Sequence, residues 1–330
     1  MGKPFTGIKS LLLSNSMKRS ILLLSGLLAV CFACTKDHFF NVIEPDQTSY
    51  VIPGETFFPE GIAYDAKQGF FYTGSLTNGD ILKVDVRTGT NVLFAPGSAQ
   101  DRMTCNGMKL DAKGRLWVCG GTQNKIHVLN PDGSLLKSWD LTTFSATGFI
   151  NDCILDENYV YFTDSWNKQV YRTSVASDIP GEIDQWLTFT DAQIPYASTG
   201  VNANGIEMTD DGQYLILIIS PVGKLYRIGI SDKSIAEIQL STPVTAGDGL
   251  WLEQHTLYVS RNALNQIFPV ALSSDYLQGT VGPGFGDGLL FNTTLAKAGS
   301  YFLAVNGQLN RRSGPTPPVL PFTVSRVPIP

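Results

Sequence analysis

Five oxygen-bearing side chains recur at one position of a repeated phrase in the sequence. They are Glu60, Asn106, Asn151, Asn204 and Asp248, and successive members are 46, 45, 53 and 44 residues apart. Two are carboxylates and three are amides, whereas His and Cys never occupy this position. Hard oxygen ligands of mixed charge favour calcium over magnesium or manganese, and they argue against zinc. If the fold brings these side chains together, the sequence predicts a calcium site.

The same residues also have a purely local interpretation. Four of them precede a glycine, and Asn-Gly and Asp-Gly are common turn pairs. Glu60 has no particular preference for turns, so turn chemistry alone explains the set poorly. Both interpretations stand at this point, and the recurrence of oxygen side chains at one repeat position favours the metal site.

The repeat that carries these residues predicts the fold. Each phrase continues into an apolar-alternating run, and two further apolar runs follow after turn signals, as in Phe70–Thr73 and Ile81–Val84. A period near 45 residues with about four short strands is typical of a propeller blade. A sixth, degenerate copy begins near Thr294. We therefore predict an all-β protein, a six-bladed β-propeller with four-stranded antiparallel blades around a central channel.

In a propeller the first strand of every blade lines the axis, so the leading residues of the repeat form a ring around the channel. Thr294 would be the sixth member of this ring. The ring must also close. Phe322–Val327 can be the third strand of the last blade and Ser49–Ile52 its fourth, which would join the two chain ends and remove open sheet edges.

The amino-terminal residues are predicted to be an export signal. Residues 1–33 contain four basic residues and no acid, and Ile21–Val30 is too short an apolar stretch to span a membrane. The small Ala33 before Cys34 resembles a bacterial lipobox, in which that cysteine is lipidated; cleavage near Ala33 with plain secretion is the alternative. We expect a signal peptide over 1–33, a tether over 34–47, and the propeller over 48–330, held to a bacterial membrane in the cell envelope.

Composition limits the partners of this chain. It has 330 residues, 43% of them apolar and 16% charged, with 32 Gly and 18 Pro, which excludes a disordered chain or a coiled coil. Residues 34–330 contain 20 Lys and Arg against 29 Asp and Glu, a formal charge of −9. Nucleic acid is therefore not expected as a partner, and a monomer is expected. Cys105, Cys119 and Cys153 are predicted to be buried and unbridged, with a Cys105–Cys119 bridge as the alternative if the two lie on neighbouring strands.

The order of the motifs resembles a known family. Phe58-Pro59-Glu60-Gly61-Ile62, Asn151-Asp152, Asn204-Gly205-Ile206 and Gly247-Asp248-Gly249-Leu250 look like the senescence marker protein (SMP-30)/gluconolactonase-like family of six-bladed propellers. The resemblance implies a calcium or other divalent ion in the channel, bound by Glu60, Asn151 and Asp248. It implies that Asn106 is a further ligand or substrate contact and that Asn204 is a channel amide near the substrate.

The sequence also departs from that family. The gluconolactonase branch carries an Arg where this chain has Thr104, and Arg102 is the nearest candidate for binding an anionic substrate group; an exposed loop Arg is the alternative. The His pair of the similar paraoxonases has no counterpart, because His38, His127 and His255 fall outside the leading position. The substrate class is therefore open.

The resemblance implies a hydrolase of a lactone, an ester or a sugar derivative. In that reaction the ion would polarise the carbonyl group, and Asp248 would act both as ligand and as general base. Asp152 is a second candidate base, with a turn-stabilising role as its alternative. Nucleophile-elbow, zincin and P-loop motifs are absent from the sequence. The rival hypothesis is a non-catalytic propeller in which the ion braces the channel and the face binds a glycan or a protein.

Overall fold

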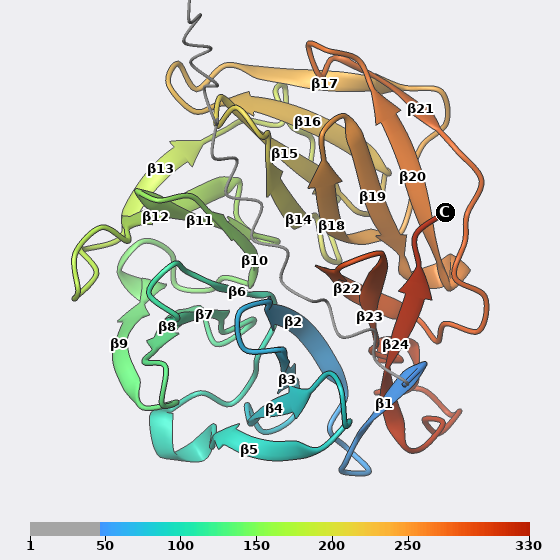
Figure 1. Cartoon of the computed structure of the whole chain (residues 1–330). Coiled ribbons are helices and arrows are strands. Elements are labelled where there is room, and N and C mark those ends of the chain that lie inside the picture. The colour runs from blue at the N-terminus through green and yellow to red at the C-terminus, as the bar shows by residue number, and fades with distance from the viewer. Residues whose placement is uncertain (1–46) are drawn as a thin grey trace, which may run out of the picture. The chain divides into compact units, whose positions relative to one another are not determined.

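A computed structural model describes residues 47–330, which form an all-β, propeller-like fold with four-stranded sheets arranged around a centre (Figure 1). The predicted signal peptide, Cys34 and most of the tether lie outside the described residues. No helix of the described part is long and apolar enough to cross a membrane.

Four layers of strands run from the centre outward. The innermost strands are β2 (Pro59–Asp65), β6 (Met108–Leu110), β10 (Ile150–Leu155), β14 (Ala203–Met208), β18 (Gly247–Glu253) and β22 (Asn292–Ala298). The second strands are β3 (Phe70–Ser75), β7 (Leu116–Cys119), β11 (Tyr159–Asp164), β15 (Tyr214–Ile219), β19 (Thr256–Arg261) and β23 (Tyr301–Asn306).

The outer half of each sheet follows the same order. The third strands are β4 (Ile81–Asp85), β8 (Lys125–Leu129), β12 (Gln169–Ser174), β16 (Lys224–Gly229), β20 (Gln266–Leu272) and β24 (Phe322–Pro328). The outermost strands are β5 (Asn91–Ala95), β9 (Leu135–Asp140), β13 (Asp184–Thr188), β17 (Ile235–Leu240), β21 (Gln278–Val281) and β1 (Ser49–Ile52). Short 3₁₀ turns are η1 (Ser98–Gln100), η2 (Leu141–Thr143), η3 (Asn262–Leu264) and η4 (Leu309–Arg311).

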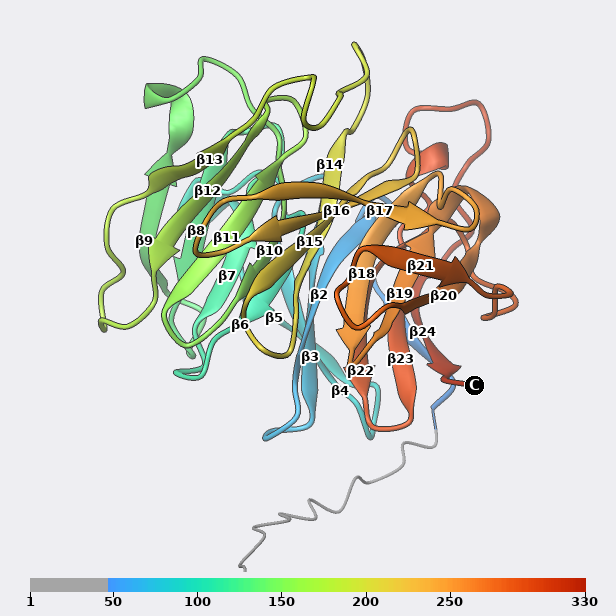
Figure 2. The same ribbon diagram turned by 90° about the horizontal axis from the view of Figure 1, so that it is seen from above.

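The innermost strands contact one another in chain order, and β22 contacts β2, so this layer is closed. Figure 2 shows β2, β14 and β18 of this layer running through the middle of the sheets. The predicted clasp is confirmed, because β1 pairs with β24 from Ser49 opposite Ser325 to Ile52 opposite Phe322. The last sheet therefore contains strands from both ends of the described chain.

One connection between sheets was not predicted. Strands β17 and β21 pair in parallel at Gln239–Gln278 and Leu240–Gly279, which joins β14–β17 and β18–β21 into one eight-stranded sheet. The other four sheets have four strands each. The outer edges at this place pair with each other and so satisfy backbone groups that would otherwise face solvent.

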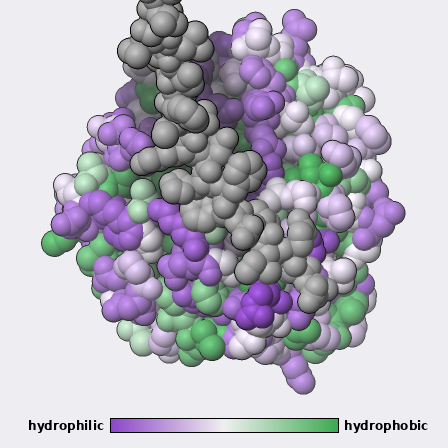
Figure 3. Space-filling model, viewed as in Figure 1, coloured by the Kyte–Doolittle hydropathy of each residue, from purple (hydrophilic) through white to green (hydrophobic). Residues whose placement is uncertain are grey.

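The apolar core lies between the faces of consecutive sheets. Trp117 of β7 packs with Phe162 of β11 at 6.2 Å between ring centroids, and both side chains are fully buried. Tyr50 of β1 likewise meets Phe71 of β3 at 5.2 Å, so the closing strand also contributes to the core. On the face seen in Figure 3, hydrophilic and hydrophobic residues are interspersed over the described surface.

Candidate functional site in the central channel

The predicted ring residues meet in one pocket. Glu60, Asn106, Asn151, Asn204 and Asp248 all line a cavity of about 260 Å³ at the amino ends of the innermost strands. We call this cavity the amino-end pocket. Its remaining lining residues are Phe149, Val201, Ser220, Asn262, Phe291, Leu309 and Asn310. The five residues that share one position of the sequence repeat therefore lie together in the folded protein.

A β-bulge at the start of the innermost strands aims these side chains. In β2, Pro59 pairs with Ser75 but Ile62 pairs with Thr73, so the strand has one extra residue at Glu60-Gly61. The same slip occurs in β10, β14, β18 and β22. A bulge bends the strand and re-aims the side chain at the irregular position.

The bulge also corrects the sixth ring position. Asn292 pairs with Asn306 and Leu295 with Ala304, so the residue equivalent to Glu60 is Thr293 rather than Thr294. The Thr293 hydroxyl donates a hydrogen bond to the Glu60 carbonyl oxygen at 2.9 Å. Thr293 itself lies outside the amino-end pocket, and the sixth copy lines the pocket through Phe291, Leu309 and Asn310 instead.

Close packing explains the glycines after the ring residues. A Cβ atom on Gly61 would lie 2.1 Å from the Asn106 carbonyl oxygen, and one on Gly107 would lie 2.2 Å from the Asp152 carboxylate. Any side chain at these two positions would push neighbouring innermost strands apart. Glycine here keeps the ring narrow enough for side chains from different sheets to share one ligand.

The two carboxylates of the pocket are buried and lack a cationic partner in its lining. Glu60 is 2% exposed and Asp248 3% exposed, and Glu60 Oε2 has no hydrogen-bond partner. Burial and the nearby Asp248 and Asp152 charges raise the pKa of Glu60 well above its usual range. Burial raises the pKa of Asp248 to about 7, although Asn262 Nδ2 donates to its Oδ2 at 3.2 Å. The pocket is therefore short of positive charge.

The amides of the ring are oriented by their own partners. Asn151 Nδ2 donates to Ser165 Oγ at 2.9 Å, so its oxygen is the atom left for a ligand. Asn106 Oδ1 accepts a long, 3.5 Å hydrogen bond from Thr104 Oγ1. A hard divalent cation prefers carboxylate and amide oxygens of this kind. The unpartnered Glu60 oxygen, together with the other carboxylate and the amide oxygens of the ring, fits such an ion.

The described residues contain no cluster of three or more His, Cys, Asp and Glu side chains that could hold a metal. The amino-end pocket has two carboxylates, and its other oxygen donors are amides. Any ion held there would depend on the neutral side chains as much as on the acids.

Asp152 does not line the amino-end pocket. It occupies the repeat position that is glycine in four other copies, and its Oδ1 accepts the Cys153 N–H at 2.8 Å. Its side chain lies against Gly107, within the channel wall. Burial raises its pKa. The structure therefore places Asp152 as a charge inside the channel and gives no support to a direct role as base in this pocket.

Arg102 is turned away from the pocket as well. Its side chain is fully buried, with Nε donating to Gly79 O at 2.9 Å and a terminal nitrogen donating to Ala95 O at 3.1 Å. Another terminal nitrogen contacts the Gln100 side chain. These contacts tie the loop after β5 to the turn before β4. The predicted role of Arg102 in binding an anionic substrate group is not supported.

The apolar rim of the pocket was missed in the sequence. Phe149 and Phe291 each stand two residues before a ring position, at Asn151 and Thr293, but Phe58 has the same offset and packs in the core, so this signal is weak. Phe149 packs edge-on against Trp166 with centroids 5.7 Å apart. Leu309 and Asn262 come from 3₁₀ turns that carry no repeat signal.

The remaining candidates are structural. His127 is 1% exposed in β8, where burial lowers its pKa to about 3, and it lies outside the pocket. Cys105, Cys119 and Cys153 are buried and free, as predicted.

Comparisons with known proteins agree with the fold. A model of the SMP-30/Gluconolactonase/LRE-like region matches residues 35–150, which include Glu60 and Asn106 but not Asp248. The match is shorter than the span over which the motifs resemble this family. No curated protein matches the chain.

Several solved propellers have a similar fold. A gluconolactonase from Xanthomonas campestris has a TM-score of 0.58 at 17% identity, over 86% of this chain and 89% of that one. The allergen Mala s 1 of Malassezia sympodialis has a TM-score of 0.63 at 13% identity, over 85% and 96%. Virginiamycin B lyase from Staphylococcus aureus has a TM-score of 0.57 at 14% identity, over 85% and 98%. At these identities the likeness shows the fold alone.

Proposed function

We propose that this chain is a divalent-metal-dependent hydrolase of a lactone or an ester, with calcium as the preferred ion. The single observation that carries the proposal is the meeting of Glu60, Asn106, Asn151, Asn204 and Asp248 around one pocket, with an oxygen of Glu60 buried and unpartnered. The family match over residues 35–150 and the gluconolactonase with a similar fold point to the same class of reaction.

We propose further that the propeller has six blades. The eight-stranded sheet then counts as two blades whose outermost strands pair at Gln239–Gln278 and Leu240–Gly279. The closed contact order of β2, β6, β10, β14, β18 and β22 supports this count. So does the recurrence of a bulge in all but one of these strands.

Glu60, Asn151 and Asp248 would hold the ion, with Asn106 as a further ligand or a substrate contact. When bound, the ion would polarise the carbonyl group and stabilise the developing oxyanion. Asn262 Nδ2 donates to the Asp248 carboxylate and so orients it, and with the ion bound this carboxylate would be ionised and could accept a proton from water. Asn204 also hydrogen-bonds to Asp248 and lies where it can contact the substrate.

The lining of the pocket favours a neutral substrate. None of its twelve lining residues is Lys, Arg or His, and two are buried carboxylates. An anionic sugar acid would meet no positive side chain there. Phe149, Val201, Phe291 and Leu309 offer an apolar rim against which the uncharged part of a lactone or ester can pack.

The rival candidate is a non-catalytic propeller that binds a glycan or a protein and uses the ion as a brace. The pocket observation that favours it is the lack of a histidine or a cation to assist the reaction. Among solved structures with this fold are an allergen and a nidogen/laminin complex as well as enzymes.

Calorimetric titration with calcium tests the metal site, using the unaltered protein and Asp248→Asn. Saturable binding that Asp248→Asn abolishes is the expected result. Glu207→Gln, a buried acid outside this pocket, is the matched control and should still bind calcium. Absence of binding to the unaltered protein would remove the metal assignment.

A panel of aryl esters and lactones, with calcium or with a chelator, tests the reaction. Calcium-dependent turnover that Asp248→Asn loses supports the hydrolase. Calcium binding without turnover on any substrate favours the rival. The panel should pair an alkyl lactone with a sugar lactone, because the apolar rim predicts faster turnover of the alkyl compound.

We propose export of the chain as a lipoprotein anchored through Cys34 in the cell envelope. The basic first 33 residues and the small residue before Cys34 support this. Mass spectrometry of membrane-fraction protein should find an acylated Cys34 at the amino terminus, and Cys34→Ser should release the protein from the membrane.

A further inference from the structure

A second ring of residues lines the opposite end of the channel. It lies three residues after the ring described above, at Ala63, Lys109, Ile154, Glu207 and Trp251. All five line a cavity of about 420 Å³ at the carboxyl ends of the innermost strands, together with Ala296, which the corrected register makes the sixth member. We call this cavity the carboxyl-end pocket.

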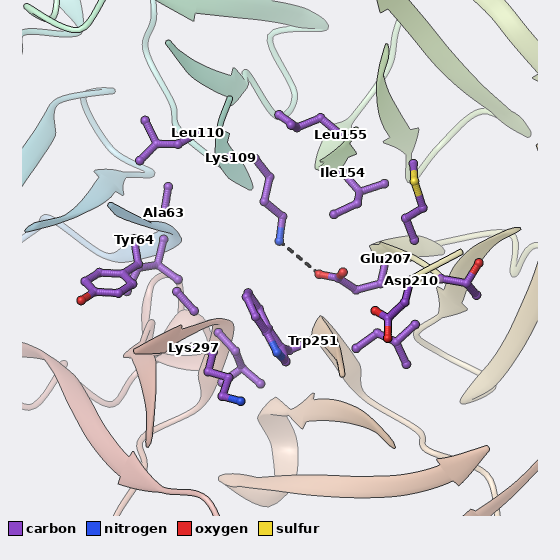
Figure 4. Close-up of a pocket in the computed structure, with 16 residues that line it drawn as sticks. Ala63, Tyr64, Lys109, Leu110, Ile154, Leu155, Glu207, Asp210, Trp251 and Lys297 are labelled. Carbon is purple, nitrogen blue, oxygen red and sulfur yellow. Dashed lines mark hydrogen bonds and ion pairs between the residues drawn. The ribbon is translucent and has the colours of Figure 1, made fainter. Parts of the chain in front are cut away.

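An ion pair crosses this pocket. Lys109 of β6 donates from Nζ to Glu207 Oε1 of β14 at 3.2 Å, and these strands are separated in the ring by β10. Figure 4 shows Lys109, Glu207 and Trp251 converging from three strands. The Lys109 nitrogen also lies 6.0 Å from the centre of the Trp251 ring. The Lys109 ammonium, the Glu207 carboxylate and the Trp251 ring therefore lie close together in this cavity.

The rest of the wall is mostly apolar. Its aliphatic and aromatic members are Ile62, Ala63, Tyr64, Leu110, Ile154, Leu155, Met208, Trp251, Leu252, Leu295 and Ala296. A cavity of this size with apolar walls and a few convergent polar groups is typical of a small-molecule site. The outer charges are Asp210 and Lys297, and Lys297 already contacts the Glu253 carboxylate.

The buried charges of this end do not balance. Lys109 faces two buried acids, because Asp152 acts on it from within the channel in addition to Glu207. Burial raises the pKa of Glu207 to about 7, and the nearby Asp152 adds to that rise, in spite of the Lys109 charge. One positive side chain among two acids leaves a place for a further positive group.

We propose that the carboxyl-end pocket binds a small molecule with an apolar body and one ammonium group. The ammonium would hydrogen-bond to the Glu207 carboxylate and lie against the face of Trp251, as cations do on indole rings. The apolar body would pack on Ile154, Leu155 and Met208. This inference does not depend on the hydrolase proposed for the other end of the channel.

Three probes with one alkyl chain test the proposal on the unaltered protein. Hexylammonium, hexanol and hexanoate have six carbons each and carry a positive, a neutral and a negative head group, and calorimetry gives the affinity of each. Hexylammonium should bind at least about tenfold more tightly than the other two, a difference of roughly 1.4 kcal/mol. Equal affinities, tightest binding of hexanoate, or binding of none of the three would overturn the proposal.

Variants place the ammonium group at Glu207. Glu207→Gln should lose the preference for hexylammonium over hexanol, whereas the exposed-acid control Glu157→Gln should keep it. Retained calcium binding and a cooperative thermal transition would show that Glu207→Gln is folded. If that variant does not fold, the comparison of the three probes on the unaltered protein still decides. A preserved preference in folded Glu207→Gln would contradict the assignment.

Discussion

The two ends of the channel are built from the same strands yet treat charge in opposite ways. At the amino-end pocket, Glu60 and Asp248 share one cavity whose lining contains no basic side chain. At the carboxyl-end pocket, three residues further along each strand, Glu207 already has Lys109 at 3.2 Å. The first end has no basic side chain to offset its acids, whereas the second has Lys109, which offsets Glu207 but leaves Asp152 without a partner of its own.

This difference shows how a repeat scaffold can give the two ends of one channel pockets of different character. A three-residue offset moves a side chain from one mouth of the channel to the other, and each mouth then varies independently. The amino-end pocket is the smaller, about 260 Å³, with a polar floor and an apolar rim. The carboxyl-end pocket, about 420 Å³, has mainly apolar walls.

The largest expected effect is a loss of calcium affinity when the metal site proposed for the amino-end pocket is altered. Asp248→Asn should weaken calcium binding by about 100-fold or more, since it removes both a ligand and a charge. Glu207→Gln should change calcium affinity by less than about threefold, because screening and distance weaken its effect. Calorimetry on both variants measures this contrast. Equal losses in the two variants would show that the ends are not separate sites.

The next largest effect is a loss of stability when the ion pair of the carboxyl-end pocket is broken. Lys109→Met should lower the free energy of unfolding by about 2 kcal/mol, since it leaves Glu207 buried without its partner. Replacing both residues, as Lys109→Met with Glu207→Leu, should recover most of the loss. Urea unfolding at pH 8 measures the two variants. If the double variant is as unstable as the single one, the stability lost in Lys109→Met does not come from breaking the ion pair.

A smaller effect is the pH dependence of the calcium-free protein. The folded-state pKa of Asp248 is raised from 3.8 to about 7, so the folded protein binds more protons than the unfolded chain between these values. Its stability should therefore fall as pH rises through this window. Glu207 contributes with the same sign. Thermal unfolding in a chelator from pH 5 to 8 measures the fall.

Two additions separate the ends in that experiment. Calcium at pH 8 should raise the free energy of unfolding by RT ln(1 + [L]/Kd), about 2.7 kcal/mol at 100 times Kd, and the melting temperature should rise with it. Both Asp248→Asn and Glu207→Gln should reduce the pH dependence, but only Asp248→Asn should lose the response to calcium. A melting temperature that rises with pH in the chelator would contradict the assignment of charges.

The smallest effect sharpens the substrate preference of the amino-end pocket. Phe149→Ala should raise KM for an alkyl lactone by about fivefold, which is roughly 1 kcal/mol of lost apolar contact. Calcium affinity should stay unchanged, because Phe149 has no ligand atom. Steady-state kinetics on alkyl and sugar lactones measures this, and an equal change for both substrates would mean that the rim does not select apolar groups.

Much of this arrangement could be predicted from sequence because the repeat fixes which positions share a place. The spacing of Glu60, Asn106, Asn151, Asn204 and Asp248 was sufficient to bring them to one pocket, and the alternating runs located the second and third strands. The sixth position was placed one residue late, at Thr294. Thr294 stands where four other copies have glycine, so the sixth copy lacks the residue that marks the register elsewhere.

Other features depended on contacts that spacing does not encode. Arg102 is the arginine nearest in sequence to Thr104, but backbone carbonyls such as that of Gly79 hold its side chain between the loop after β5 and the turn before β4. The Lys109–Glu207 pair joins residues 98 positions apart. The sequence does contain a sign of this pair, because both residues stand three places after a ring residue. Only the strand geometry shows that side chains at this offset line a second pocket.

The clasp between β1 and β24 sets the order in which the molecule can assemble. Ser49 pairs with Ser325, so β1 cannot pair until β24 has been synthesised, after every other strand of the described chain. Closing a loop of that length carries an entropic cost, and such long-range contacts slow folding. Ring closure is therefore expected to be a late event, and both pockets become complete only when it occurs.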